Sequence, residues 1–177
     1  LYSKKAINSV SDLKGLKFRA YNSATIRIAE LTGMAPTKIE AAEISQAFST
    51  GAVESMITSP TTGKNSKIWE NGVGYFYDIA AWFPKNMVIV NKDAWNKLDS
   101  ATKKLVMSEA AVAEKKGWEL SKKGNVADKK ALSDAGMKVG KVNSALEKHF
   151  QKVGATMADE WKAKAGSRGA SVLAAYK

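Results

Sequence analysis

The amino-acid sequence predicts an α/β fold in its first half and an almost wholly helical second half. Two observations support this. Short runs of β-forming residues alternate with helical segments up to about residue 91, which is typical of a sheet with crossover helices. From Asp93 onward the pattern is almost entirely helical. The 177 residues are enough for one ordinary domain or two small lobes.

The strands and helices expected in the first half are bounded by turn and capping residues. Asn22 or Ser23 is a good N-cap for a helix that ends at Gly33, and Gly51 closes a second helix. A third helix is expected to run through Ile68 and Trp69 after a loop at 59–63. The expected strands lie at 16–20, 37–41, 55–58, 75–79 and 86–91.

The second half is dominated by one long helix. Asp99 or Ser100 caps a stretch that runs to about Ala135, and its two internal glycines leave room for a kink. A short strand is expected at 137–139, a helix from 143 or 144 through 161, and a last helix at 171–176.

Composition excludes several kinds of chemistry. The chain has no cysteine, which removes disulfides, thiolate metal sites and cysteine nucleophiles. A multi-histidine metal site is impossible because His149 is the single histidine. The sequence also lacks a nucleophile-elbow serine motif, a P-loop and a dinucleotide-binding glycine motif. We therefore predict no catalytic residue, no metal and no cofactor.

The net charge of +11 arises from 28 Lys and Arg residues against 17 Asp and Glu residues. The lysines recur in pairs along the expected helices, whereas nucleic-acid-binding proteins usually cluster their charge and interleave it with aromatic residues. We interpret them as a solvated helical face and predict no nucleic-acid partner. The alternative is a basic interaction module that binds nucleic acid or another polyanion.

Arg19 combines two anion-binding features. It lies in an expected strand immediately before the helix that Asn22 caps, where open α/β sheets place their ligands. A guanidinium fork matches a carboxylate bidentately, and the N–H groups of Ser23, Ala24 and Thr25 would be free at the helix N-terminus. The other interpretation, an exposed arginine paired with a nearby acid, stays open on local sequence alone.

Residues 12–60 resemble the second lobe of substrate-binding proteins of the TRAP (tripartite ATP-independent periplasmic) transporters, the dicarboxylate-type DctP family. The matching pieces are DLKG-LK-x-R, a helix ending in glycine, Pro36, and an E-x-x-x-A-x-x-x-G-x-V-E segment. A later NMVIVNKDAWNKL run and the long helix extend the resemblance over nearly the whole chain.

The resemblance implies a periplasmic-binding-protein-like lobe with a mixed sheet, a long connecting helix and a helical C-terminal part, with the first lobe missing or incomplete. Residues 1–90 would form the ligand-binding lobe. Residues 91–177 would form the lobe-spanning helix and the C-terminal helices that pack on the absent lobe.

The resemblance also implies a function. Such a protein captures a small organic acid in the periplasm and delivers it to the membrane subunits of a TRAP transporter, and it is not an enzyme. The full-length protein would carry a signal peptide. A homodimer through the helices is possible, although Trp118 and Trp161 are interpreted first as packing residues.

The family's ligand-binding positions carry over to particular residues. The carboxylate-clamping arginine corresponds to Arg19, and Ala41 or Ala42 stands where the family often has a bulky residue. With Trp82 nearby, this small side of the cleft indicates a ligand with an apolar or aromatic body. The predicted ligand-binding residues are Arg19, Asn22, Ser23, Thr58, Ser59, Trp82 and Phe83.

Overall fold

A computed structural model describes residues 1–81 and 86–175, and its centre is one six-stranded sheet in the order β3-β2-β4-β1-β5-β6. β1 is antiparallel to β4 and β5, whereas the pairs β2–β3, β2–β4 and β5–β6 are parallel. The sheet is therefore mixed, as predicted. Its strands are β1 (Tyr2–Ser3), β2 (Lys17–Ala20), β3 (Ala35–Lys38), β4 (Ser55–Met56), β5 (Tyr75–Tyr77) and β6 (Lys138–Gly140).

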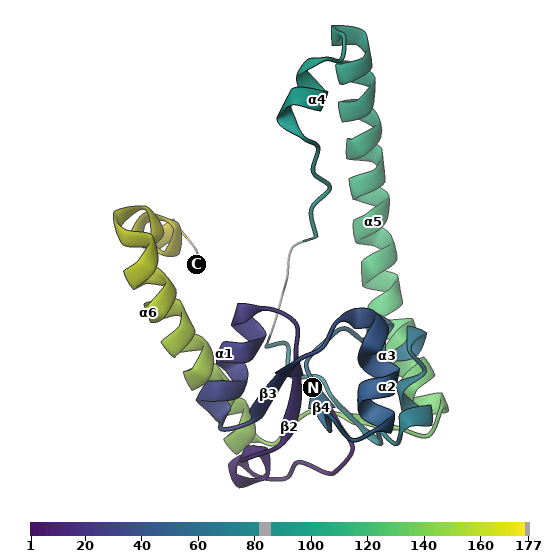
Figure 1. Cartoon of the computed structure of the whole chain (residues 1–177), viewed down its shortest axis with the longest axis vertical. Coiled ribbons are helices and arrows are strands. Elements are labelled where there is room, and N and C mark those ends of the chain that lie inside the picture. Colours follow the sequence, from purple (N-terminus) through teal and green to yellow (C-terminus); the bar gives the residue numbers. More distant parts are fainter. Residues whose placement is uncertain (82–85, 176–177) are drawn as a thin grey trace.

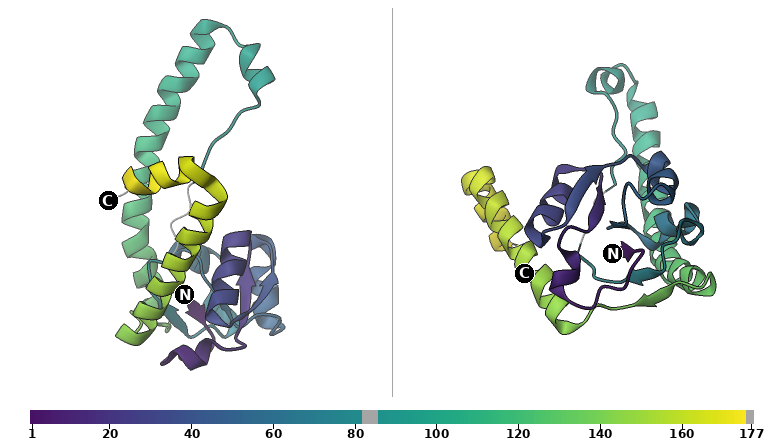
Figure 2. Two further views of the ribbon diagram at one scale, coloured as in Figure 1. Left: turned by 90° about the vertical axis from the view of Figure 1, so that its left-hand side faces the viewer. Right: turned by 60° about the horizontal axis from the view of Figure 1, so that its bottom comes forward.

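Helices cover both sides of this sheet. α1 and the start of α6 lie on one side, and α2, α3 and the base of α5 lie on the other (Figure 1 and Figure 2). The α-helices are α1 (Ser23–Thr32), α2 (Ile44–Ser49), α3 (Pro60–Asn65), α4 (Lys92–Asn96), α5 (Ser100–Asp134) and α6 (Ser144–Ala175). Three short 3-10 helices complete the fold: η1 (Val10–Leu13), η2 (Ala41–Glu43) and η3 (Ile68–Asn71).

Each side of the sheet has its own apolar cluster. On the first side, Phe18 of β2 and Ile28 of α1 pack with Leu146 and Phe150 of α6. On the second side, Tyr2 packs against Phe76 with ring centroids 4.7 Å apart, in a cluster that also holds residues of α2, η3 and α5. The base of the long helix and the start of the last helix are therefore integral to the lobe.

The β2–α1–β3 unit forms as the sequence predicts. Asn22 caps α1 by accepting a hydrogen bond from the backbone N–H of Thr25 at 2.9 Å, and Gly33 ends the helix in the left-handed conformation at φ 77°. The following strand begins at Ala35, two residues earlier than expected. It contains Pro36, which is tolerated because β3 is an edge strand.

Residues 59–63 are expected to be a loop but instead begin helix α3. The hydroxyl of Ser59 accepts a hydrogen bond from the N–H of Thr62 at 3.1 Å, and Pro60 occupies the first turn. Serine at the N-cap followed by proline is a helix-start signal, because proline lacks the N–H that a first turn cannot satisfy. The expected helix through Ile68 and Trp69 is only the 3-10 turn η3.

The predicted strand at 86–91 is wrong for this chain. Residues 86–90 form no strand, and Met87, Val88 and Ile89 are 77%, 106% and 84% exposed. A β-forming run becomes a strand only when another strand pairs with it, and within the described residues none does.

The long helix forms as predicted, and Asp99 caps it through the N–H of Thr102 at 2.8 Å. Beyond the sheet it runs through solvent toward α4, so Trp118 is 63% exposed (Figure 1). Trp161 on α6 is 45% exposed but its ring lies beside the buried Gly169, so of the two tryptophans only Trp161 has a packing contact of the expected kind. No described helix is both long and apolar enough to cross a membrane.

The last two expected helices are both present as two helical segments within α6, which meet at a kink where Gly166 has non-helical backbone angles (φ 60°, ψ −147°). The short strand expected at 137–139 is β6, which pairs with β5 in the sheet although it follows α5. The division into parts at residue 90 stays a prediction.

The close packing of Gly63 against Tyr2 gives a first testable prediction. A Cβ atom added at Gly63 would overlap the ring of Tyr2, which is fully buried. We expect Gly63→Ala to lower the free energy of unfolding by about 1–3 kcal/mol in denaturant titrations.

Gly117→Ala is the matched control, because no heavy atom lies within 4 Å of its added Cβ. It should stabilise the exposed helix by about 0.5–1 kcal/mol. Equal midpoints for Gly63→Ala and the unaltered protein would contradict the packing described here.

Candidate functional site

The carboxyl ends of β3, β2 and β4 meet at one edge of the sheet, because these three neighbouring strands are parallel. Arg19 lies near this edge, in register with Thr37 of β3 and Met56 of β4. Asn22 and Ser23 follow β2, and Thr58 and Ser59 follow β4. Five of the seven predicted ligand-binding residues therefore lie at or near the carboxyl ends of these parallel strands. Trp82 and Phe83 lie outside the described residues.

The Arg19 side chain is buried, with only 4% of the residue exposed. Its Nε–H donates to the carbonyl of Ile39 at 2.9 Å, and its Cζ lies 4.7 Å from the ring centroid of Tyr21. Burial lowers the pKa of Arg19 from its ordinary value, with Tyr21 and Glu40 opposing that shift, but a guanidinium remains charged at neutral pH. Among residues 1–81 and 86–175, Arg19 forms no ion pair with an acid.

The interpretation of Arg19 as an exposed arginine paired with an acid does not hold within the described chain. The one protein acceptor described for its guanidinium is the Ile39 carbonyl, which takes the Nε–H. A buried charge is costly unless it is paired and hydrogen-bonded. Within residues 1–81 and 86–175 neither Nη group donates to a protein acceptor, so both are candidates for binding an anion.

Asn22 and Ser23 contribute to the edge mainly through the backbone. The Asn22 side-chain oxygen caps α1, and Ser23 is exposed at the first helical position. The N–H of Thr25 is used by the cap, so it is not free as the sequence analysis expected. Ser23 and Ala24 keep the N–H groups of a helix N-terminus, which favour negative charge nearby.

Ser59 is held in place at the start of α3, directly after Thr58. The Ser59 carbonyl accepts a hydrogen bond from the Tyr2 hydroxyl at 3.0 Å, and the Ser59 hydroxyl caps α3. α3 is tied to α5 through Asp128, which accepts from the Thr61 hydroxyl at 2.6 Å and from Lys64 at 2.7 Å.

Sequence reasoning missed Tyr21 and Asp128. Tyr21 had a detectable signal: it is two residues after Arg19, and alternate residues of an extended chain point to the same side. Asp128 had none, because in the sequence it is one more charged residue of a long polar helix. Its partners on α3 lie more than sixty positions away.

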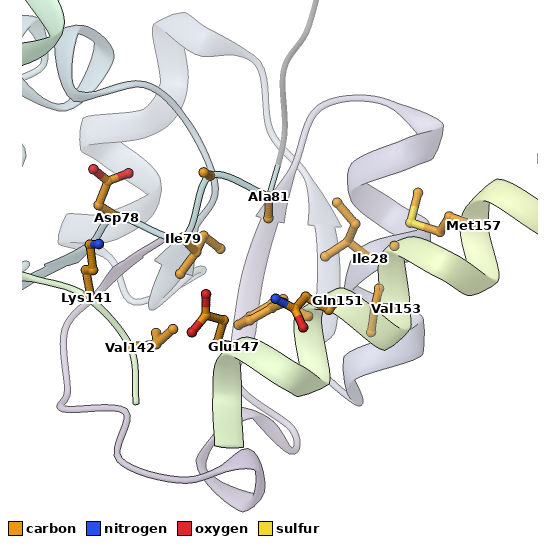
Figure 3. A pocket seen from close by; sticks show the side chains of 13 residues that line it. Ile28, Asp78, Ile79, Ala81, Lys141, Val142, Glu147, Gln151, Val153 and Met157 are labelled. Carbon is orange, nitrogen blue, oxygen red and sulfur yellow. The ribbon is translucent and has the colours of Figure 1, made fainter. Parts of the chain in front are cut away.

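A cavity of about 540 Å³ lies elsewhere, between α1, α6 and the segment after β5 (Figure 3). Ile28, Phe150 and Met157 supply apolar lining, and Glu147 and Gln151 supply polar groups. None of the five predicted site residues that the structure describes lines it. We therefore place the candidate site at the strand edge, where the buried charge is. No cluster of three or more metal-ligating acids or histidines exists within the described residues.

Comparisons with known proteins agree on one family. The family model described as bacterial extracellular solute-binding protein, family 7 (DctP), matches residues 1–164. The sialic acid-binding periplasmic protein SiaP of Vibrio cholerae is 30% identical over 107 residues, which cover 59% of this chain and 32% of SiaP.

Solved structures resemble the chain along nearly all of its length. DctP6 of Bordetella pertussis, an extracytoplasmic solute receptor binding pyroglutamic acid, is 40% identical with a TM-score of 0.95; the match covers 99% of this chain and 58% of DctP6. A marine metagenome TRAP solute-binding protein specific for pyroglutamate is 36% identical with a TM-score of 0.95, over 99% and 57% of the two chains. The chain thus spans less than two thirds of these relatives.

The Asp128 cluster gives a second prediction. Hydrogen bonds from Lys64 and Thr61 lower the pKa of Asp128 below its ordinary value of 3.8. A lowered folded-state pKa adds stability above the unfolded value, and that stability is lost as the pH falls through the folded-state pKa. We expect Asp128→Asn to destabilise the protein at pH 7 by about 1–3 kcal/mol.

Denaturant titrations across a pH series provide the measurement. The difference in the free energy of unfolding between Asp128→Asn and the unaltered protein should become smaller as the pH drops below about 4. Asp134→Asn is the control, because its ion pair with Lys130 is solvent-exposed and should contribute little. A difference that stays constant down to pH 2 would refute a charged Asp128 in this role.

Proposed function

We propose that this chain, which belongs to the bacterial extracellular solute-binding protein family 7, forms the carboxylate-clamping lobe of a TRAP-type receptor for a small organic acid. The observation that carries the proposal is Arg19, a buried guanidinium near the carboxyl ends of parallel strands that forms no ion pair with an acid among the described residues. Family membership confirms the resemblance found in the sequence and the predicted location outside the cytoplasm.

The relatives indicate the class of ligand. Two that are 40% and 36% identical are described with pyroglutamate, and one from Ralstonia eutropha that is 26% identical is described with 2-acetolactate. Each ligand is compact and carries a carboxylate. Pyroglutamate is therefore the first probe for this chain, and the small side chains of Ala41 and Ala42 would leave room for a ring. An apolar or aromatic ligand body stays a prediction.

The mechanism follows from the chemistry of the site. The ligand carboxylate would dock on the paired Nη donors of Arg19, near the N–H groups of Ser23 and Ala24. Closure of a second lobe over this edge would remove water and strengthen the charge pair, which shifts a hinge equilibrium toward the closed form. The membrane subunits of a TRAP transporter would then receive the ligand.

No bond-making step is part of this proposal, and the protein acts as a receptor rather than an enzyme. The predicted absence of nucleic-acid binding and the helix-mediated homodimer stay predictions.

The clamp gives a third prediction. In the full polypeptide that contains this sequence, Arg19→Ala should weaken pyroglutamate binding by about 30-fold to several thousand-fold, because truncating one partner of a buried charge pair costs about 2–5 kcal/mol. Arg19→Lys should recover little, since an ammonium cannot reproduce the guanidinium fork. Isothermal titration calorimetry measures both.

Lys17→Ala is the matched control, since it removes a positive charge from the other end of the same strand, where Lys17 contacts the Gly51 carbonyl. It should bind within about twofold of the unaltered protein, because exposed charges are screened by salt. Arg19→Ala binding within about threefold would show that the clamp is elsewhere. An affinity for polyanions that collapses with added salt would instead support the basic interaction module.

A further inference from the structure

We infer that Tyr21 is the positioning residue of the Arg19 clamp, and that its ring fixes the guanidinium plane so that only the paired Nη donors face the ligand. The inference deepens the proposed function and rests on it. It identifies a determinant of ligand binding that does not itself need to contact the ligand.

Two contacts hold the guanidinium from different directions. The Nε–H donates to the Ile39 carbonyl at 2.9 Å, and the Tyr21 ring lies 4.7 Å from Cζ, well within the range of a cation–π contact. The hydrogen bond to the Ile39 carbonyl restrains movement of the Arg19 guanidinium within its own plane. We expect the ring to restrain movement of the guanidinium, because Cζ lies over it. Together they leave the group little freedom.

Tyr21 is itself anchored. Its backbone N–H donates to the Thr25 hydroxyl at 3.0 Å, and that hydroxyl donates in turn to the carbonyl of Asn22 at 3.0 Å. Thr25 is fully buried in the first turn of α1. The backbone of Tyr21 is therefore tied to the capped start of α1, and its ring lies beside the Arg19 guanidinium.

This arrangement selects the direction of approach. One of the five guanidinium N–H donors is used by Ile39, so the remaining donors are those of the two Nη atoms. With the Tyr21 ring beside Cζ and the Nε–H already bonded, a carboxylate would meet the guanidinium at its two Nη atoms, in the geometry of a bidentate pair. Without the ring, the Arg19 side chain would lose its conformational freedom only when the ligand binds, and this ordering would weaken the affinity.

The first experiment needs no ligand. In the isotopically labelled full polypeptide, hydrogen exchange of the Arg19 Nε–H is followed by NMR. Tyr21→Leu should accelerate this exchange by about fivefold to thirtyfold, whereas Tyr21→Phe, which keeps the ring, should leave it within about twofold. Unchanged exchange in Tyr21→Leu overturns the inference whatever the protein binds. Tyr21→Met replaces Tyr21→Leu if thermal unfolding shows that the leucine variant does not fold.

The second experiment is a double-mutant cycle with pyroglutamate as the probe. Tyr21→Leu should weaken binding by about fivefold to thirtyfold, and Tyr21→Phe by less than about threefold. In the Arg19→Lys background, Tyr21→Leu should change affinity by less than about twofold, because there is no guanidinium plane to hold. A merely structural role would give the same loss in both backgrounds and would contradict the inference.

The outcomes separate this inference from the proposed function. If Arg19→Ala still bound pyroglutamate strongly, the proposed role of Arg19 as the clamp would be refuted. The hydrogen-exchange experiment would still decide whether Tyr21 orders the Arg19 side chain. Loss of binding in Arg19→Ala together with full binding in Tyr21→Leu would preserve the clamp and refute Tyr21 as its positioning residue. Equal losses in Tyr21→Phe and Tyr21→Leu would assign the effect to the Tyr21 hydroxyl and overturn a role for the ring.

Discussion

The pairing of β2 with a parallel strand on each side is the constraint on which the site depends. Because β3, β2 and β4 run in the same direction, the segments that follow them all emerge at one edge. Arg19 is thereby flanked by β3, which leads to the Ile39 carbonyl, and by β4, which leads to Thr58, although these residues are far apart in the sequence. The helix start at Asn22 then places N–H groups beside a buried positive charge. Any change that tilted β2 would disturb each of these features together.

Much of this edge could be predicted from the sequence because its signals are local. Asn22 and Gly33 mark the ends of α1 through capping and a left-handed backbone, which need only neighbouring residues. The location of Arg19 before a helix start follows from the same signals. Family resemblance added the link to Thr58, which depends on the order of strands in the sheet. Local patterns cannot supply that order, and the role of Arg19 as a clamp stays a prediction.

Other features depended on distant partners, and there the sequence was misleading. The run around Val88 has the composition of a strand, but no described strand pairs with it. Asp128 resembles any solvated acid of α5, yet it is buried against Lys64. The start of α3 was a different kind of error: Ser59 and Pro60 carry a local helix signal that the loop interpretation overlooked.

The anchoring of α5 has a mechanical consequence. Asp128 fastens the helix to the lobe near one end, and the rest of the helix extends toward α4 (Figure 1). At 1.5 Å per residue, the distance from Asp128 to Ser100 is about 42 Å. A rod of that length acts as a lever: tilting it by about 5° at the base moves its far end by about 4 Å. A slight adjustment around Lys64 would therefore become a displacement larger than a water molecule at the opposite end of the protein.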